Sequence, residues 1–337
     1  MAVSSADDLV GWTPVRVSWG DAGPVVDWCH TEGVAFTEPF FSETVERCLR
    51  HPFRLLFRHE TGMEEVARFV ADHPGLAPTG FIFHMSRCGS TLVAQMLAAV
   101  PEHLVLSEPG PLDSVLRAPA SPVVAADQRR TWLRWMVAAL GQPRGAQAAL
   151  FVKFDAWSVT ELALVRRTFP HVPWLFLFRD PVEVLVSHLR RPGAHVIPGA
   201  LPAAALGLPA TSEGTGVSLV EHAARVLARI CEQALEWATD PLVTFVDYDE
   251  LPGFVLDDLL AAWAVPVSAA GLRCMAAAAR RDAKNPCLEF EPDDGAKHKW
   301  ATPEIRAAAD RWVASPYERL RAASAVHRRR RGAARAG

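Results

Sequence analysis

The sequence of 337 residues predicts an α/β fold in which a central parallel sheet lies between layers of helices. Short apolar runs recur along the chain without polar alternation, and each is followed by a helical pattern. Continuous apolar strands that alternate with helices are typical of a parallel sheet covered on both faces. Half of the residues are hydrophobic and 22% are charged, a composition typical of a globular chain. The predicted strands cover residues 80–84, 104–106, 150–153, 174–178 and 242–246.

Helical periodicity follows the first of these strands most clearly. Leu92, Met96 and Val100 recur at i, i+4 and i+8, which places them on one face of a helix. Two further helices are predicted, one over 158–170 that begins at the capping-box pattern Ser158-Val-Thr-Glu161, and one over 217–238.

The chain divides into segments of different composition. Residues 1–77 are rich in Trp, Phe and Pro and form an N-terminal extension in which no element is predicted. Residues 78–325 form the main α/β domain, and a stretch rich in Pro, Gly and Ala over 192–216 is predicted to be a lid-like loop insertion. The basic run over 326–337 is expected to be a disordered tail.

Charge and cysteine content exclude several classes of protein. Thirty-five basic and 38 acidic residues give a net charge of −3, without the basic excess that a general nucleic-acid binder needs. The six cysteines form no CxxC pair and fit no zinc spacing, so we expect reduced thiols and no metal. We find no secretory signal and no apolar run long enough to span a membrane, and we therefore expect a cytoplasmic protein.

The turn after the first predicted strand carries the strongest signal of a binding site. It reads Met85-Ser-Arg-Cys-Gly-Ser-Thr91 and leads directly into the first helix. Gly89 allows the backbone to bend closely around a bound group, and the unpaired N–H groups at the helix start attract an anion. Arg87 adds a guanidinium suited to oxyanions. The turn is therefore predicted to bind phosphate, the alternative being a capped turn with an exposed arginine.

The turn lacks the features of an NTP-hydrolysing loop. No lysine precedes Ser90, so the pattern GxxxxGK[ST] is absent. No acidic residue ends a strand in the position expected of a magnesium ligand. A nucleotide hydrolase is therefore disfavoured.

A second basic motif follows the strand over 174–178. Arg179-Asp-Pro181 opens a helix that contains Ser187, with Pro181 suited to the first helical position and Asp180 to the cap. Arg179 then projects from the carboxyl edge of the sheet, where open α/β sheets bind ligands. Arg179 and Ser187 are predicted to hold one phosphate together. The alternative is a salt bridge from Arg179 to Asp180 or Glu183.

Together these two motifs resemble those of the sulfotransferases, which have a P-loop-type three-layer fold. The family combines a strand–loop–helix [K/R]-x-G-[S/T]-[S/T] with a strand followed by R-[D/N]-P-x5-S. Here they read Arg87-Cys-Gly-Ser-Thr91 and Arg179-Asp-Pro-Val-Glu-Val-Leu-Val-Ser187. The resemblance covers residues 78–191 well and extends weakly to Val246-Asp-Tyr-Asp-Glu-Leu251.

The resemblance implies a donor, a product and the residues that bind them. The donor would be 3′-phosphoadenosine 5′-phosphosulfate, the product adenosine 3′,5′-bisphosphate, and the acceptor a small molecule or a peptide. Residues 1–77 and 192–216 would shape the acceptor side. Arg87, Cys88, Gly89, Ser90 and Thr91 would hold the 5′-phosphosulfate, Arg179 and Ser187 the 3′-phosphate, and Lys297 or Lys299 of a late basic loop would cover the nucleotide.

The resemblance also implies the catalytic groups. Arg87 and Glu108 resemble the tyrosylprotein branch, which places a glutamate base after the first helix. Cytosolic members instead use a histidine after the strand that ends here in Lys153. No histidine follows Lys153 closely, so Glu108 is the predicted base, with Asp155 as a competing one. Arg87 and Lys153 would stabilise the developing charge. The alternative functions are a magnesium-dependent nucleotide kinase or NTPase and a nucleotide-binding module without activity.

Overall fold

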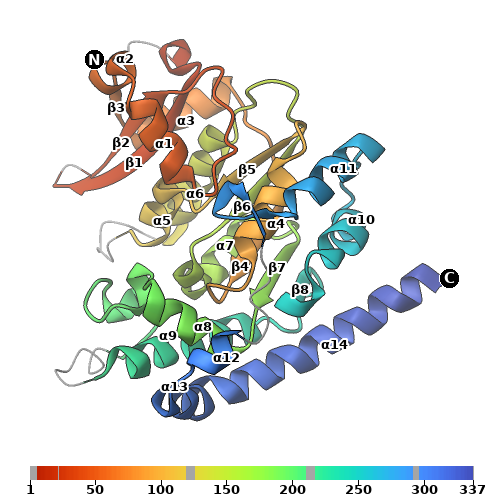
Figure 1. Cartoon of the computed structure of the whole chain (residues 1–337). Coiled ribbons are helices and arrows are strands. Elements are labelled where there is room, and N and C mark those ends of the chain that lie inside the picture. The colour runs from red at the N-terminus through yellow and green to blue at the C-terminus, as the bar shows by residue number, and fades with distance from the viewer. Residues whose placement is uncertain (1–5, 22, 119–125, 210–216, 291–295, 337) are drawn as a thin grey trace.

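The computed structural model describes residues 6–21, 23–118, 126–209, 217–290 and 296–336. Its centre is a five-stranded sheet in which every neighbouring pair of strands is parallel, in the order β5-β6-β4-β7-β8 (Figure 1). All five predicted strands are confirmed. They are β4 (Pro78–His84), β5 (His103–Ser107), β6 (Ala149–Lys153), β7 (Trp174–Phe178) and β8 (Val243–Asp247).

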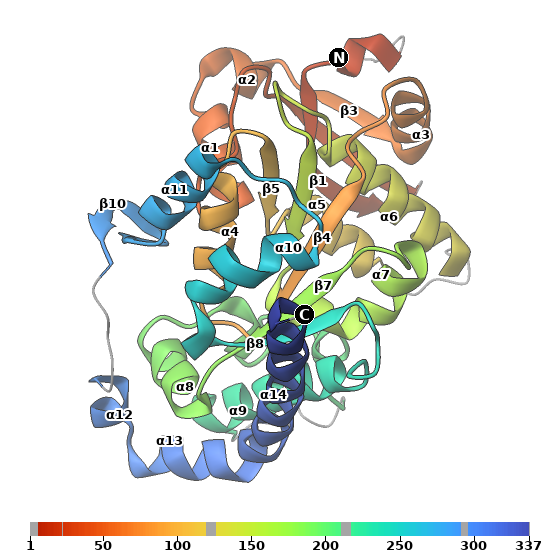
Figure 2. The ribbon, with the colours of Figure 1, turned by 90° about the vertical axis from the view of Figure 1, so that its right-hand side faces the viewer.

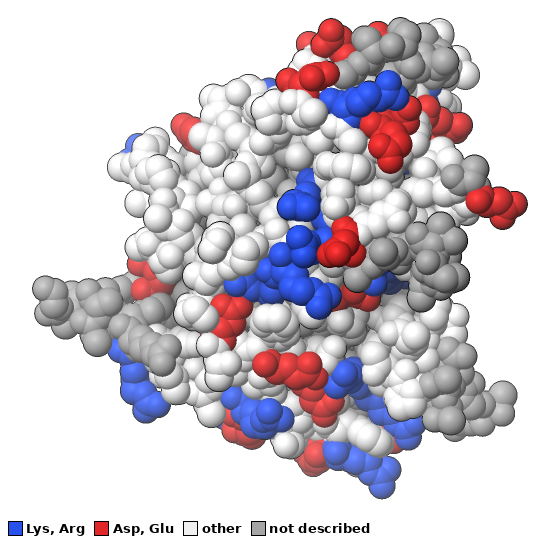
Figure 3. Space-filling model, turned by 180° about the vertical axis from the view of Figure 1, so that it is seen from behind, with Lys and Arg blue, Asp and Glu red and all other residues white. Residues whose placement is uncertain are grey.

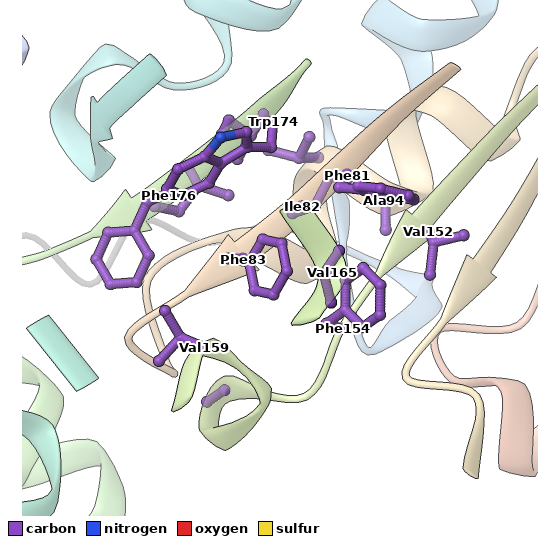
Figure 4. Packing of buried hydrophobic residues seen from close by; sticks show 14 of the residues in the cluster. Phe81, Ile82, Phe83, Ala94, Val152, Phe154, Val159, Val165, Trp174 and Phe176 are labelled. Atoms are coloured by element: carbon purple, nitrogen blue, oxygen red, sulfur yellow. The ribbon is translucent and has the colours of Figure 1, made fainter. Parts of the chain in front are cut away.

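Aromatic side chains of neighbouring strands pack against one another in the buried cluster of the sheet (Figure 4). Phe83 of β4 stacks on Phe154, with ring centroids 4.7 Å apart and planes 9° apart, and meets Trp174 of β7 edge-on. Phe81 and Phe83 are fully buried, and each large apolar side chain removed from water contributes about 1.5–3 kcal/mol. Both faces of the strands are covered, so the strands read as unbroken apolar runs.

Helices lie on both sides of the sheet. In Figure 2, α4 (Ser90–Ala98) and α11 (Ala269–Ala278) lie on one side, and α6 (Ala126–Leu140) and α7 (Leu162–Thr168) on the other. The predicted helix over 217–238 is confirmed as α9. The other α-helices of the main α/β domain are α5 (Gly110–Leu116), α8 (Pro181–Arg190), α9 (Leu219–Leu235), α10 (Leu260–Ala262), α12 (Ala296–Trp300), α13 (Pro303–Ala308) and α14 (Ala314–Ala336). A hairpin of β9 (Arg281–Asp282) and β10 (Asn285–Glu289) precedes α12.

The N-terminal extension folds into a small antiparallel sheet with three helices. The sheet contacts α5 and α6, and its Val17, Val26 and Trp28 belong to the same hydrophobic cluster as the central strands. Trp28 is buried in it and donates a hydrogen bond from Nε1 to Thr61 Oγ1 (2.8 Å). Its elements are β1 (Trp12–Gly20), β2 (Gly23–His30), α1 (Phe41–Leu49), α2 (Pro52–Leu56), β3 (His59–Gly62) and α3 (Met63–Asp72).

The predicted capping box at Ser158 is wrong. Residues Ala156–Glu161 form a 3-10 turn, and α7 begins only at Leu162, without a side-chain cap. Ser158 is buried, and its hydroxyl has no hydrogen-bond partner among the described residues. Because Ala156 and Val159 pack into the core, tertiary contacts override the local capping pattern.

The C-terminal tail is helical where disorder was expected. Helix α14 continues to Ala336, because arginine and alanine favour a helix and the segment extends one that already packs on α9 and β8. His327 anchors it, since its Nδ1 accepts a hydrogen bond from the backbone N–H of Phe245 (3.1 Å) and its ring stacks on the Phe245 ring. The segment over 192–216 is a loop with 3-10 turns at Ala194–Val196 and Ala203–Leu206; residues 210–216 of this predicted insertion lie outside the described part.

Charged side chains of both signs share the surface. On the face opposite to that of Figure 1, Lys and Arg gather near the middle, with Asp and Glu beside them (Figure 3). In the described ranges, no helix combines the length and the apolar character that a membrane span needs.

Candidate functional site

The predicted anion-binding turn lies at the point where the order of the sheet reverses. Strand β4 has β6 on one side and β7 on the other, and the turn follows its carboxyl end. In open α/β sheets the crevice at such a point is where ligands bind. The local sequence therefore delivers Arg87 and the start of α4 to the centre of this edge.

The turn has an unusual backbone. Ser86, Arg87 and Gly89 all have positive φ, at 79°, 52° and 83°. Such conformations are costly for residues other than glycine and concentrate at functional sites. A Cβ at Gly89 would lie 2.6 Å from Leu251 Cδ1 and 3.0 Å from the Tyr248 ring, so a larger residue would displace these side chains and would also be strained at this positive φ. The conformation brings backbone N–H groups and the start of α4 to one concave surface, which suits an oxyanion.

A pocket of about 250 Å³ opens on this turn, and we call it the phosphate pocket. Five cationic side chains and only one acidic side chain line it, an excess of positive charge that favours a polyanionic ligand. The residues that line it are Arg87, Cys88, Gly89, Ser90, Thr91, Leu92, Arg179, Ser187, Tyr248, Arg281, Asp282, Ala283, Lys284, Phe290 and Lys297.

The structure therefore brings the two predicted motifs together. Lys297 also lies in the phosphate pocket, whereas Lys299 is exposed on α12 and is not part of the lining. Cys88 is buried, and its thiol donates to the Leu177 carbonyl (3.2 Å), so this side chain is directed into the core.

Arg179 forms the salt bridge that the sequence offered as the alternative interpretation, and it also lines the phosphate pocket. It is buried in the wall of the phosphate pocket, and its guanidinium stacks on the Tyr248 ring at 3.8 Å. It also pairs with Glu183, with Nε 2.5 Å from Oε2. Asp180 caps α8 as predicted, accepting from the backbone N–H of Glu183 (3.1 Å). The ion pair and the stacking hold the guanidinium in place before any ligand arrives.

A second pocket of about 220 Å³ adjoins the phosphate pocket, and we call it the acceptor-side pocket. The two pockets share Arg87, Ser90, Thr91 and Lys284, so the helix start lies between them. The other residues that line the acceptor-side pocket come from the N-terminal extension, from the ends of β4 and β5, from the loop after β6 and from the loop after α8. They are Phe40, His84, Ser86, Glu108, Ala156, Trp157, Gly193, Ala194 and His195.

Glu108, Lys153 and His84 form a buried polar cluster beside this pocket. The Lys153 ammonium is fully buried and donates to the Glu108 carboxylate, and His84 Nε2 lies 3.5 Å from the same oxygen. Burial by itself would raise the pKa of Glu108, but Lys153 and His84 outweigh it and hold that pKa far below its usual range. Glu108 therefore stays ionised next to the acceptor-side pocket.

His84 is held in place by the backbone. Its Nδ1 accepts from the N–H of Ser86 (3.0 Å), and its Nε2 lies 3.1 Å from the Phe154 carbonyl. Burial and the nearby Lys153 lower its pKa, so the ring is neutral at pH 7. With Nδ1 as acceptor, Nε2 carries the proton.

Asp155 lies behind this cluster. It is not among the residues that line the acceptor-side pocket. Burial and the negative charges of Glu108 and Asp113 raise its pKa well above its usual value. A carboxyl group in this setting binds a proton more readily than Glu108 does.

Sequence reasoning missed two further groups. His195, in the loop after α8, lies in edge-to-face contact with His188 of α8. Both ring nitrogens of the buried His195 lack a hydrogen-bond partner among the described residues. Burial is the main cause that lowers the pKa of His188 to about 2 and that of His195 to about 3. Lys284 and Arg281 come from the β9–β10 hairpin. The charged run Arg280-Arg-Asp-Ala-Lys284 was the one available signal for them.

The polar groups of the site suit an anionic ligand. Within the described ranges, no group of three or more His, Cys, Asp and Glu side chains is arranged to hold a metal. The phosphate pocket instead offers cations at the turn and at Arg179, two separated points suited to a ligand with two phosphate positions.

Comparison with known proteins gives similar solved structures. No family model matches the chain, and no curated protein matches it. A sulfotransferase domain from the curacin biosynthetic pathway is 17% identical, with a TM-score of 0.43, over 71% of this chain and 97% of that chain. A sulfotransferase from Mycobacterium avium is 12% identical (TM-score 0.42; 74% and 81% covered), and retinol dehydratase in a complex with retinol and PAP is 14% identical (TM-score 0.36; 77% and 87% covered). Two of these three similar structures are thus sulfotransferases, and the third is a retinol dehydratase.

Proposed function

We propose that this protein transfers a sulfuryl group from 3′-phosphoadenosine 5′-phosphosulfate to a hydroxyl or amine of a small molecule or peptide. The observation that carries the proposal is the junction of the two pockets at one helix start. The phosphate pocket has the charge for a doubly phosphorylated nucleotide, and the acceptor-side pocket holds an ionised carboxylate within reach of the same junction.

Two groups of residues in the phosphate pocket would bind the two ends of the donor. Gly89, Ser90 and Thr91 at the start of α4 would bind its 5′ end through backbone N–H groups and hydroxyls. Arg179 and Ser187 would bind the 3′-phosphate at the other end, and Lys297 is close enough to share it. Positioned in this way, the bond to be broken faces the acceptor-side pocket.

In the transfer, the acceptor oxygen or nitrogen forms a bond to sulfur, and the bond from sulfur to the phosphate oxygen breaks. The donor supplies the activated sulfuryl group and leaves as adenosine 3′,5′-bisphosphate. Arg87, Lys153 and the amides of α4 stabilise the negative charge that develops on the leaving oxygen. The proton of the acceptor passes to Glu108.

Two observations favour Glu108 over Asp155 as the base. Glu108 lines the acceptor-side pocket, whereas Asp155 does not. Glu108 is also ionised at neutral pH, while the raised pKa of Asp155 favours its protonated form. The pairing with Lys153 weakens Glu108 as a base, but it keeps the carboxylate oriented.

The test is a transfer assay with the labelled donor and a panel of phenols, alcohols, amines and tyrosine peptides, read by mass spectrometry. We expect at least one acceptor to gain a sulfuryl group, with one bisphosphate released for each product molecule. Donor that is consumed only by hydrolysis at the rate seen without protein, whatever the acceptor, would contradict the proposal.

A further inference from the structure

Lys284 occupies a position that the sequence motifs did not indicate. It lies in the turn between β9 and β10, and it lines both the phosphate pocket and the acceptor-side pocket. Asp282 Oδ1 accepts from the backbone N–H of Lys284 (2.9 Å) and from that of Asn285 (2.8 Å), which fixes the turn. The N–H of Phe290 donates to the Arg280 carbonyl (2.9 Å) and closes the hairpin behind it. The hairpin therefore holds Lys284 against the junction.

The charge around Lys284 is predominantly positive. Arg87, Lys153 and Arg191 are near enough to lower its pKa, against the opposing effect of Glu108. Burial is the largest contribution, and together these effects lower the pKa of Lys284 to about 8. No carboxylate in the described part of the chain forms an ion pair with its ammonium.

This arrangement favours the binding of an anion. Although its side chain is exposed to solvent, the Lys284 ammonium lies among other cations at the junction of the two pockets, with no ion-paired carboxylate in the described part of the chain. The nearby acid, Glu108, is already paired with Lys153. An anion at the junction would contact Lys284 from the hairpin and the start of α4 from the sheet.

We propose that Lys284 is a catalytic residue whose ammonium binds the sulfuryl group while it passes between the two pockets. The inference rests on the proposed function, which places the transferred group at the residues that the pockets share. Arg87 and the amides of α4 face that group from one side, and Lys284 faces it from the hairpin. The positive charge of Lys284 stabilises the reacting groups most strongly when the leaving oxygen becomes negative.

The experiment compares Lys284→Gln and Lys284→Arg with the matched control Lys299→Gln, a lysine exposed on α12 outside the pocket. We expect Lys284→Gln to lower kcat by about 100-fold, the usual loss for one charge-stabilising donor. Lys284→Arg should retain most of the activity, and Lys299→Gln all of it. Thermal melting of each variant separates a loss of chemistry from a loss of fold.

A pH profile of bisphosphate binding provides a second readout. A lysine with a pKa near 8 is charged below that pH, and a bound anion favours the charged form. The affinity of the wild-type protein should therefore fall as pH rises above 8, by up to about tenfold per unit. Lys284→Arg stays charged, so this part of the pH dependence should disappear.

The outcomes separate the two claims. Suppose that the wild-type protein binds bisphosphate and transfers sulfuryl groups. If Lys284→Gln then retains kcat within about twofold, or Lys284→Arg keeps the wild-type pH profile, the role of Lys284 is wrong and the proposed function stands. If the wild-type protein binds no bisphosphate, the proposed function fails, and the assignment of Lys284 fails with it.

Discussion

The Arg179→Ala variant is expected to bind adenosine 3′,5′-bisphosphate about 100-fold more weakly than the wild-type protein, a loss of about 2.7 kcal/mol. The substitution removes the buried guanidinium that we propose binds the 3′-phosphate. It also removes the guanidinium that pairs with Glu183, so the carboxylate, with His298 still nearby (3.8 Å), adds negative charge beside the phosphate. Isothermal titration calorimetry without added metal measures the change directly.

Two variants make this result specific. Arg167→Ala removes an exposed arginine on α7 and should bind like the wild-type protein. Arg179→Ala combined with Glu183→Gln should recover part of the lost affinity, because the repulsive carboxylate is gone. An Arg179→Ala protein that folds and retains the wild-type affinity would remove Arg179 from the site.

The Glu108→Gln variant is expected to lower turnover by about 10²- to 10⁴-fold, the range typical of a positioned base. Glutamine keeps the shape of the side chain but accepts a proton far less readily. It also removes the ion pair with the fully buried Lys153, so some loss of stability should accompany the loss of rate. Bisphosphate binding should persist, since Glu108 is not part of the phosphate pocket.

The comparison with Asp155→Asn identifies the base. If Glu108 takes the proton, Asp155→Asn should reduce turnover much less than Glu108→Gln does. Glu102→Gln, at an exposed glutamate just before β5, should have no effect. Normal turnover by a folded Glu108→Gln protein, with a large loss in Asp155→Asn, would transfer the role to Asp155.

The parts of the molecule that the sequence predicted well are those set by local patterns. Each strand of the central sheet contains a short apolar run, and the turn that is predicted to bind phosphate lies between such a run and a helical repeat. Parallel strands place their carboxyl ends at one edge, so the meeting of Arg87 with Arg179 followed from the fold class.

Long-range packing decided the rest. The N-terminal sheet pairs β2 with β3 across almost thirty intervening residues of chain, a contact that no short pattern reveals. Ser158 is drawn into the core instead of capping a helix. Lys284 and His195 reach the site from a hairpin and a loop whose positions depend on the folded chain, so their composition alone gave no assignment.

The central claim is that the two basic motifs bind a doubly phosphorylated adenosine, and a thermal-shift titration tests it most directly. At 100 times its dissociation constant, a ligand stabilises the folded state by about 2.7 kcal/mol. We expect adenosine 3′,5′-bisphosphate to raise the melting temperature without metal, and ATP with magnesium to raise it much less. A larger shift with ATP and magnesium, or no shift with the bisphosphate at saturating concentration, would contradict the account.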